Sequence, residues 1–86
     1  MATDRRLDRN RDVRAAMGWG NSTFYQNIKD GLFVEPVKIG PRSSAWPSDE
    51  VSTLQDAYIA GESKEQIRKL VAKLHAARKA RLGGGR

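Results

Sequence analysis

The sequence contains no cysteine and only one histidine among its 86 residues. The absence of cysteine excludes disulfides, thiolate metal sites and thiol catalysis. Without a second histidine or a nucleotide-binding glycine loop, no set of catalytic residues can be assembled. We therefore expect a protein that is not an enzyme and that uses no metal and no cofactor. His75 lies among cations near the C-terminus and is expected to be a solvated surface residue.

Long hydrophobic runs are also missing. No apolar stretch approaches the ~18 residues that a membrane span needs, and residues 1–6 have no hydrophobic signal-peptide region. The sequence therefore predicts no membrane partner and a cytoplasmic location. At this length the chain has room for one small domain, whose core must be economical.

Positive charge is concentrated at one end of the chain. Residues 62–86 carry eight Lys and Arg against Glu62 and Glu65, which accounts for the whole net charge of +6. Residues 13–47 carry four cations and two anions, a local excess of two. A mildly positive surface of this kind is expected where a protein meets phosphate.

The order of elements over residues 10–47 is the most informative feature of the chain. An apolar stripe of Val13, Ala16 and Met17 predicts a short helix, which Gly18 and Gly20 end in a tight turn. A second helix follows over residues 21–30, and a hairpin over residues 38–45. This order predicts a winged helix-turn-helix, a mainly α fold with a small β-hairpin wing.

The sequence divides into four segments. We expect a flexible N-terminal arm over residues 1–9, a winged helix-turn-helix DNA-binding domain over 10–61, a basic amphipathic helix over 62–82, and a flexible tail over 83–86. Within the domain, Phe33, Val37 and Ile39 are spaced for one face of an extended strand. Pro36 favours an edge strand or the approach to a strand.

Polar residues at three positions have the chemistry of helix N-caps. Asn10 is expected to cap the first helix, Asn21 or Ser22 the second, and Ser48 the third. Residues 49 and 50 are both acidic and would support the N-terminus of that third helix through its dipole. Ser63 followed by Gln66 fits a capping box at the start of the C-terminal helix.

Small and hydrogen-bonding side chains on the second helix suit a recognition helix in the major groove. Gln26 can make a bidentate contact with adenine, and Asn27 can do the same if it points into the groove. Other polar and basic side chains of both helices and the wing are suited to phosphate oxygens. The candidate DNA-binding residues are Arg11, Arg14, Asn21, Ser22, Thr23, Tyr25, Gln26, Asn27, Lys29, Lys38, Arg42, Ser43 and Ser44.

Several short motifs resemble the AlpA family. They are Ser22-Thr23-Phe24-Tyr25, Ile28-Lys29-Asp30-Gly31, Pro36-Val37-Lys38-Ile39-Gly40, and Trp46 followed by an acidic helix start. The resemblance spans roughly residues 7–61. It implies a phage or prophage DNA-binding regulator with a MerR-like, excisionase-like winged helix. Its role would be to control excision or the transcription of integrase and phage genes.

The C-terminal helix has three interpretations, which can coexist. Its apolar stripe of Ile67, Leu70, Val71 and Leu74 could pack on the domain core or pair with a second copy. Its cations could instead contact DNA phosphate or an acidic partner such as an integrase. These cations are Lys64, Arg68, Lys69, Lys73, Arg78, Lys79 and Arg81.

Function therefore has three alternatives. The first is regulation through double-stranded DNA, with a homodimer, a cooperative oligomer, an integrase or the transcription machinery as open partners. The second is a protein-interaction adaptor acting through residues 62–82. The third is RNA binding through residues 64–81. The sequence has no aromatic residue after Tyr58 on which bases could stack, which argues against this third alternative.

Overall fold

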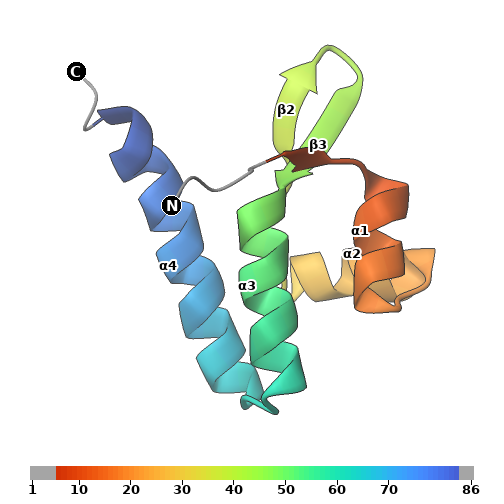
Figure 1. Ribbon diagram of the computed structural model, residues 1–86, viewed down its shortest axis with the longest axis vertical. Coiled ribbons are helices and arrows are strands. Elements are labelled where there is room, and N and C mark those ends of the chain that lie inside the picture. The colour runs from red at the N-terminus through yellow and green to blue at the C-terminus, as the bar shows by residue number, and fades with distance from the viewer. Residues whose placement is uncertain (1–5, 84–86) are drawn as a thin grey trace.

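The computed structural model describes residues 6–83 of the chain, and the side chains of residues 6–80. Its elements are β1 (Leu7–Asp8), α1 (Asn10–Met17), α2 (Asn21–Lys29), β2 (Val37–Gly40), β3 (Ser43–Pro47), α3 (Ser48–Ile59) and α4 (Lys64–Gly83). The three strands form an antiparallel sheet in the order β1-β3-β2. This mostly helical fold with a small sheet is compatible with the predicted winged helix-turn-helix (Figure 1).

The strand β1 is an element that the sequence did not predict. Leu7 and Asp8 were expected within a flexible arm, yet they pair with β3. Backbone N–H of Arg6 donates to Ser48 Oγ at 2.7 Å, and backbone N–H of Ser48 donates to the Arg6 carbonyl at 2.7 Å. Residues 1–5 of the predicted arm and residues 84–86 of the predicted tail lie outside the described residues.

The predicted N-caps are wrong at three helices. The residue at the cap position is Arg9 for α1, Gly20 for α2 and Pro47 for α3, and none of them makes a side-chain cap hydrogen bond. Two of the expected caps have other partners: Asn10 bonds Tyr25, and Ser48 accepts the bond from Arg6. At α4 the backbone N–H of Gln66 does donate to Ser63 Oγ at 3.2 Å, which is half of the predicted capping box.

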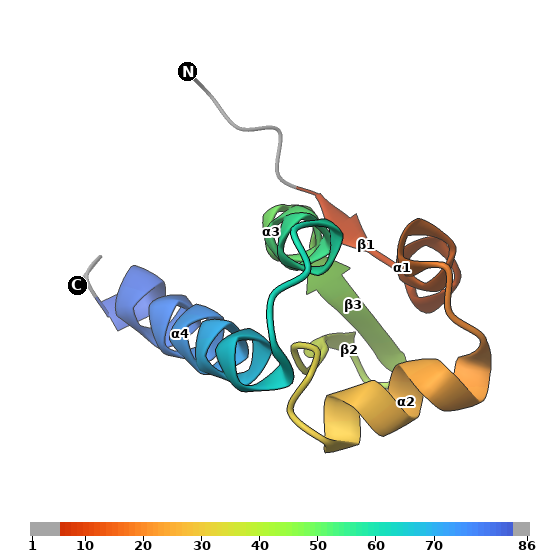
Figure 2. The same ribbon diagram turned by 90° about the horizontal axis from the view of Figure 1, so that it is seen from below.

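A left-handed glycine sets the angle between α1 and α2. Gly18 ends α1 with φ of 72°, a conformation that costs glycine no steric energy, and the N–H of Trp19 then returns to the Arg14 carbonyl at 3.0 Å. Figure 2 shows α1 end-on and α2 from the side, so the two helices cross. This crossing leaves one long face of α2 at the surface.

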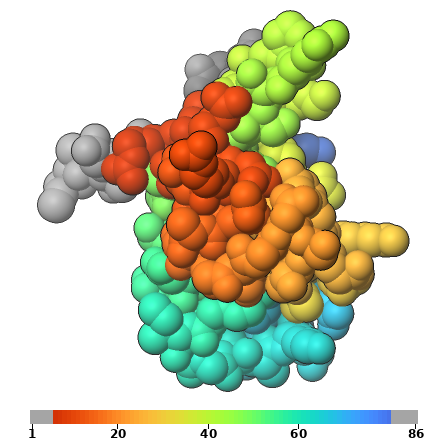
Figure 3. Space-filling view, turned by 90° about the vertical axis from the view of Figure 1, so that its right-hand side faces the viewer, coloured from red at the N-terminus to blue at the C-terminus, as the bar shows by residue number. Residues whose placement is uncertain are grey.

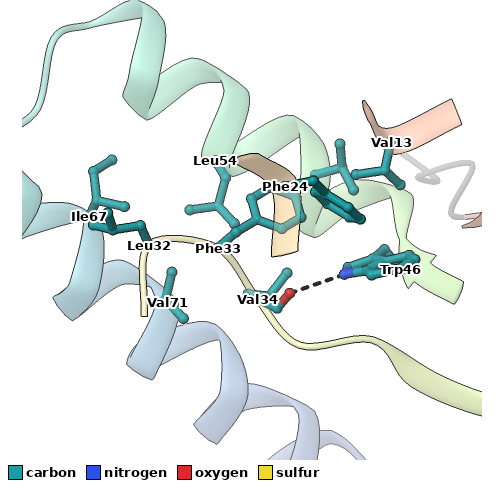
Figure 4. Close-up of a cluster of buried hydrophobic side chains, with 10 residues drawn as sticks. Val13, Phe24, Leu32, Phe33, Val34, Trp46, Leu54, Ile67 and Val71 are labelled. Atoms are coloured by element: carbon teal, nitrogen blue, oxygen red, sulfur yellow. Dashed lines mark hydrogen bonds between the residues drawn. The ribbon is translucent and has the colours of Figure 1, made fainter. Parts of the chain in front are cut away.

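The core is built from α1, α2, the loop before β2, β3, α3 and α4 (Figure 4). Phe24 of α2 packs against Phe33 and Trp46, with ring centroids 5.7 and 5.0 Å away. The indole N–H of Trp46 donates to the Val34 carbonyl at 3.0 Å. Because this polar group is paired, the large ring can be buried without leaving an unsatisfied donor.

The prediction of one apolar strand face over Phe33, Val37 and Ile39 is wrong. Phe33 is buried, but it lies in the loop before β2, whereas Ile39 is 44% exposed. The reason is a bulge in the hairpin. Lys38 pairs with Ser44 and Gly40 with Ser43, so Ile39 is an extra residue between them.

The helix α4 packs on the core, which is the first of its three predicted interpretations. Ile67 and Val71 are buried, while Leu70 and Leu74 are half-buried against the same cluster. Figure 1 shows α4 beside α3, on the side away from α1. The rest of the chain therefore covers Ile67 and Val71 fully and Leu70 and Leu74 in part.

Two residues of α4, His75 and Arg78, hold its second half through polar contacts. Glu50, expected to support the N-terminus of the third helix, lies in the first turn of α3 but is buried, and it forms an ion pair with Arg78 at 2.6 Å. Arg78 also donates to the Glu35 carbonyl at 2.7 Å. His75 is not the solvated residue that we expected, since it is half-buried and its Nε2 accepts the N–H of Glu35 at 3.0 Å.

Candidate nucleic-acid interface

The exposed side of α2 carries six of the thirteen predicted contact residues. Phe24 is buried and Ile28 is half-buried, and this i, i+4 pair sets the rotation of the helix. Asn27 is also half-buried. The residues left exposed, which we call the α2 face, are Asn21, Ser22, Thr23, Tyr25, Gln26 and Lys29.

A short hydrogen-bond network joins the α2 face to α1. Asn10 Nδ2 donates to the Tyr25 hydroxyl at 2.7 Å, and Arg14 Nε donates to Asn10 Oδ1 at 2.8 Å. The Tyr25 oxygen accepts in this network, so its own hydrogen is free to donate to a phosphate oxygen. Arg14 is half-buried and tied to Asn10, which makes it a weaker candidate for a phosphate contact than exposed Arg11.

The side chain of Gln26 is held by a hydrogen bond to Asp30, one helical turn further along the chain. Its Nε2 donates to Asp30 Oδ1 at 3.0 Å, and both side chains are exposed. An amide nitrogen has two hydrogens and the amide oxygen has two lone pairs. One N–H and the whole oxygen of Gln26 therefore remain available, which are the groups that a bidentate contact with adenine uses.

The wing, formed by β2 and β3, adds two exposed cations. Lys38 lies on β2 and Arg42 in the turn, and neither forms an ion pair with any side chain in the described range. Their neighbours Ser43 and Ser44 are half-buried, with Ser44 opposite Lys38 in the hairpin register. Cations without an internal partner can neutralise phosphates without first breaking an ion pair.

The elements that carry the predicted residues share one side of the molecule. Figure 3 shows α1, α2 and the wing together on this side, whereas α4 lies on the other side of α3 in Figure 1. The structure thus gathers the predicted α1, α2 and wing residues and leaves most of the basic C-terminal helix apart from them.

The cations of α4 divide into two groups. Arg78 is engaged with Glu50, and Arg68 Nε donates to the Asp30 carbonyl at the end of α2, at 3.0 Å. The remaining cations whose side chains are described are exposed: Lys64, Lys69, Lys73 and Lys79. The side chain of Arg81 lies outside the described side chains.

Sequence reasoning missed three residues that shape this surface. Asn10 was expected only as a cap, Asp30 only as a helix end, and Arg68 only as a free cation. The spacing of Asn10 and Arg14 at i, i+4 is a signal that could have revealed the first. The contacts of Arg68 with the end of α2 span 38 residues, and no local pattern predicts them.

Within the described residues there is neither a candidate metal site nor a membrane-spanning helix. In that range there is no group of three or more His, Cys, Asp or Glu side chains that could hold a metal ion. No helix of residues 6–83 is long and apolar enough to cross a membrane.

Comparison with known proteins places this chain in a class of regulators. The family model described as prophage CP4-57 regulatory protein (AlpA) matches residues 6–57, more than half of the chain. The fold and the match define a small phage- or prophage-type regulator of the DNA-binding kind. The chain belongs to the AlpA family. No curated protein and no solved structure matches it.

The match covers the N-terminal elements of the fold. The matched residues begin just before β1 and end inside α3, so they include α1, α2 and the wing. The helix α4 lies wholly outside them. The family membership therefore bears on the surface built by α1, α2 and the wing, and not on the basic C-terminal helix.

Proposed function

We propose that this protein is a sequence-specific DNA-binding regulator of a phage or other mobile element. It acts in the cytoplasm of the bacterial cell, where it controls excision or the transcription of integrase and phage genes. The α2 face enters the major groove, and the wing lies on the backbone or in the adjoining minor groove. The observation that carries this proposal is the α2 face, whose hydrogen-bonding side chains are exposed on the same side as wing cations that form no ion pair within the described residues.

Each part of the surface has a distinct task in this proposal. Gln26 reads a base edge, with its amide oriented by Asp30. The Tyr25 hydroxyl and Lys29 contact phosphates on either side of the groove. Asn21, Ser22 and Thr23 lie in the first turn of α2, where backbone N–H groups also favour a phosphate.

The structure weakens the alternative that this protein is a protein-interaction adaptor acting through residues 62–82. It relied on the amphipathic character of residues 62–82, but the apolar stripe of that helix is packed against the core. What α4 offers a partner is a polar face with exposed lysines. This surface can attract an acidic partner, but Leu70 and Leu74 are half-buried against the core, and residues 64–83 include no aromatic anchor of the kind that often dominates stable protein interfaces.

The test is a pair of glutamine variants on selected DNA. Sites are first selected from random duplexes with the full chain, and affinities are then measured by gel shift. Gln26→Ala should weaken binding to the selected site by about 1–3 kcal/mol while leaving random duplex unchanged. Gln66→Ala, an exposed glutamine on α4, is the matched control and should change neither. Equal losses on selected and random duplex for Gln26→Ala would overturn the assignment of base reading.

A further inference from the structure

Ile39 is an apolar side chain exposed in the middle of a basic wing. The bulge between Lys38 and Gly40 removes it from regular pairing, and 44% of its surface is exposed. Bulges are known to redirect a side chain at the edge of a sheet. A β-branched residue at this position is not needed for the core, since Ile39 is not part of the buried cluster.

The surroundings of Ile39 differ from those of the other strongly exposed isoleucine. Ile59, at the end of α3, is 77% exposed, and its neighbours Asp56 and Glu62 are exposed anions. Ile39 instead lies between Lys38 and Arg42, both exposed and without an ion pair in the described range. A polyanion is therefore attracted to the surface around Ile39 and repelled from that around Ile59.

We propose that Ile39 is an apolar contact to the floor and sugar walls of the DNA minor groove. Lys38 and Arg42 bind the phosphates along its edges. The inference rests on the proposed function, because it requires the wing to face DNA. The minor groove is about 6 Å wide, and proteins that enter it often insert an apolar side chain flanked by cations.

This contact carries a prediction about sequence preference. Both A·T and T·A pairs present only acceptors in the minor groove, whereas G·C adds the guanine N2 amino group. That amino group projects into the space an isoleucine would occupy, and its one hydrogen that is not paired with cytosine would be left without an acceptor. The wing should therefore prefer A·T pairs through Ile39, independently of what the α2 face reads in the major groove.

The experiment separates the two grooves by base substitution. In a selected site, the base pairs beside the α2 footprint are made A·T, G·C or inosine·C, where the base of inosine, hypoxanthine, is guanine without the N2 amino group. The full chain should bind the A·T and inosine·C duplexes equally, and about fivefold more tightly than G·C. Ile39→Ala should bind all three with the weaker affinity. Ile59→Ala should keep the preference.

The outcomes distinguish this inference from the proposed function. If the full chain selects no site, the proposed function itself is wrong. If it selects a site but treats the three duplexes alike, or if Ile39→Ala retains the preference, only the role of Ile39 is overturned. A change in oligomer size for Ile39→Ala with unchanged DNA preference would assign the side chain to a protein contact and would also overturn it. Ile39→Thr, which keeps the β-branch, replaces the alanine variant if that variant does not fold.

Discussion

The region of α1, α2 and the β2–β3 hairpin differs from α4 in how it uses its cations. On α2 and the wing, Lys29, Lys38 and Arg42 are exposed and form no ion pair within the described residues. On α4, Arg78 is only 19% exposed and binds Glu50, while Arg68 holds the end of α2. Part of the positive charge of the C-terminal segment is therefore used in contacts within the fold. Net charge along the sequence overstates how much of α4 is free to bind phosphate.

The two regions also differ in whether the family model covers them. Residues 6–57 match the AlpA family, and α4 begins beyond them. Yet α4 completes the core by burying Ile67 and Val71, and its Arg78 neutralises the buried Glu50 of α3. The matched region thus leaves an apolar surface and a buried carboxylate that this chain covers with its own C-terminal helix.

The largest expected effect comes from removing the cation that α4 contributes to the core. Arg78→Ala leaves Glu50 buried without a partner, which should lower the free energy of unfolding by about 3–5 kcal/mol. Urea denaturation measures this value. The control is Lys79→Ala, an exposed neighbour on the same helix, which should change stability by less than about 0.5 kcal/mol. Similar losses in the two variants would show that α4 is not anchored through this pair.

A smaller effect should separate the two regions on DNA. The double variant Lys38→Ala/Arg42→Ala removes two phosphate contacts, and the slope of log affinity against log salt should become shallower by about two. The matched double variant Lys69→Ala/Lys73→Ala removes two exposed lysines of α4 and should leave the slope unchanged. Filter binding at four salt concentrations measures both slopes. A larger change for the α4 variant would place the main DNA contact on α4.

The smallest expected effect is on how the free energy of unfolding changes at alkaline pH. Burial raises the pKa of Tyr58 above its ordinary value of 10.0, and its hydroxyl donates to the Leu32 carbonyl. The unfolded chain releases this proton at lower pH than the folded chain, so Tyr58 should stabilise the protein below pH ~10 and lose this contribution as pH rises further.

The measurement compares two tyrosine variants. The free energy of unfolding is followed from pH 8 to pH 11 in the parent chain, in Tyr58→Phe and in Tyr25→Phe. Tyr58→Phe should reduce the alkaline loss of stability, whereas Tyr25→Phe, with 48% of the residue exposed, should leave it unchanged. Identical pH profiles for all three proteins would contradict the role assigned to the Tyr58 proton.

Local patterns predicted the elements better than their ends and contacts. The stripes around Val13, Phe24 and Ile67 depend on helical periodicity, and these residues are buried as expected. The N-caps failed because Asn10 and Ser48 found partners in other elements. The strand face failed at Ile39 because a bulge is a property of two paired strands and not of one.

By itself the sequence determined the order of helices and hairpin, the family, and the polar composition of the α2 face. These depend on residue spacing and residue type, which are local. Only the tertiary structure decided which cations are free, that Glu50 is buried against Arg78, and that Ile39 is exposed between Lys38 and Arg42. Each of these results depends on burial or on contacts between elements. Electrostatic pairing and exposure follow distance in space, which the position of a residue along the chain does not specify.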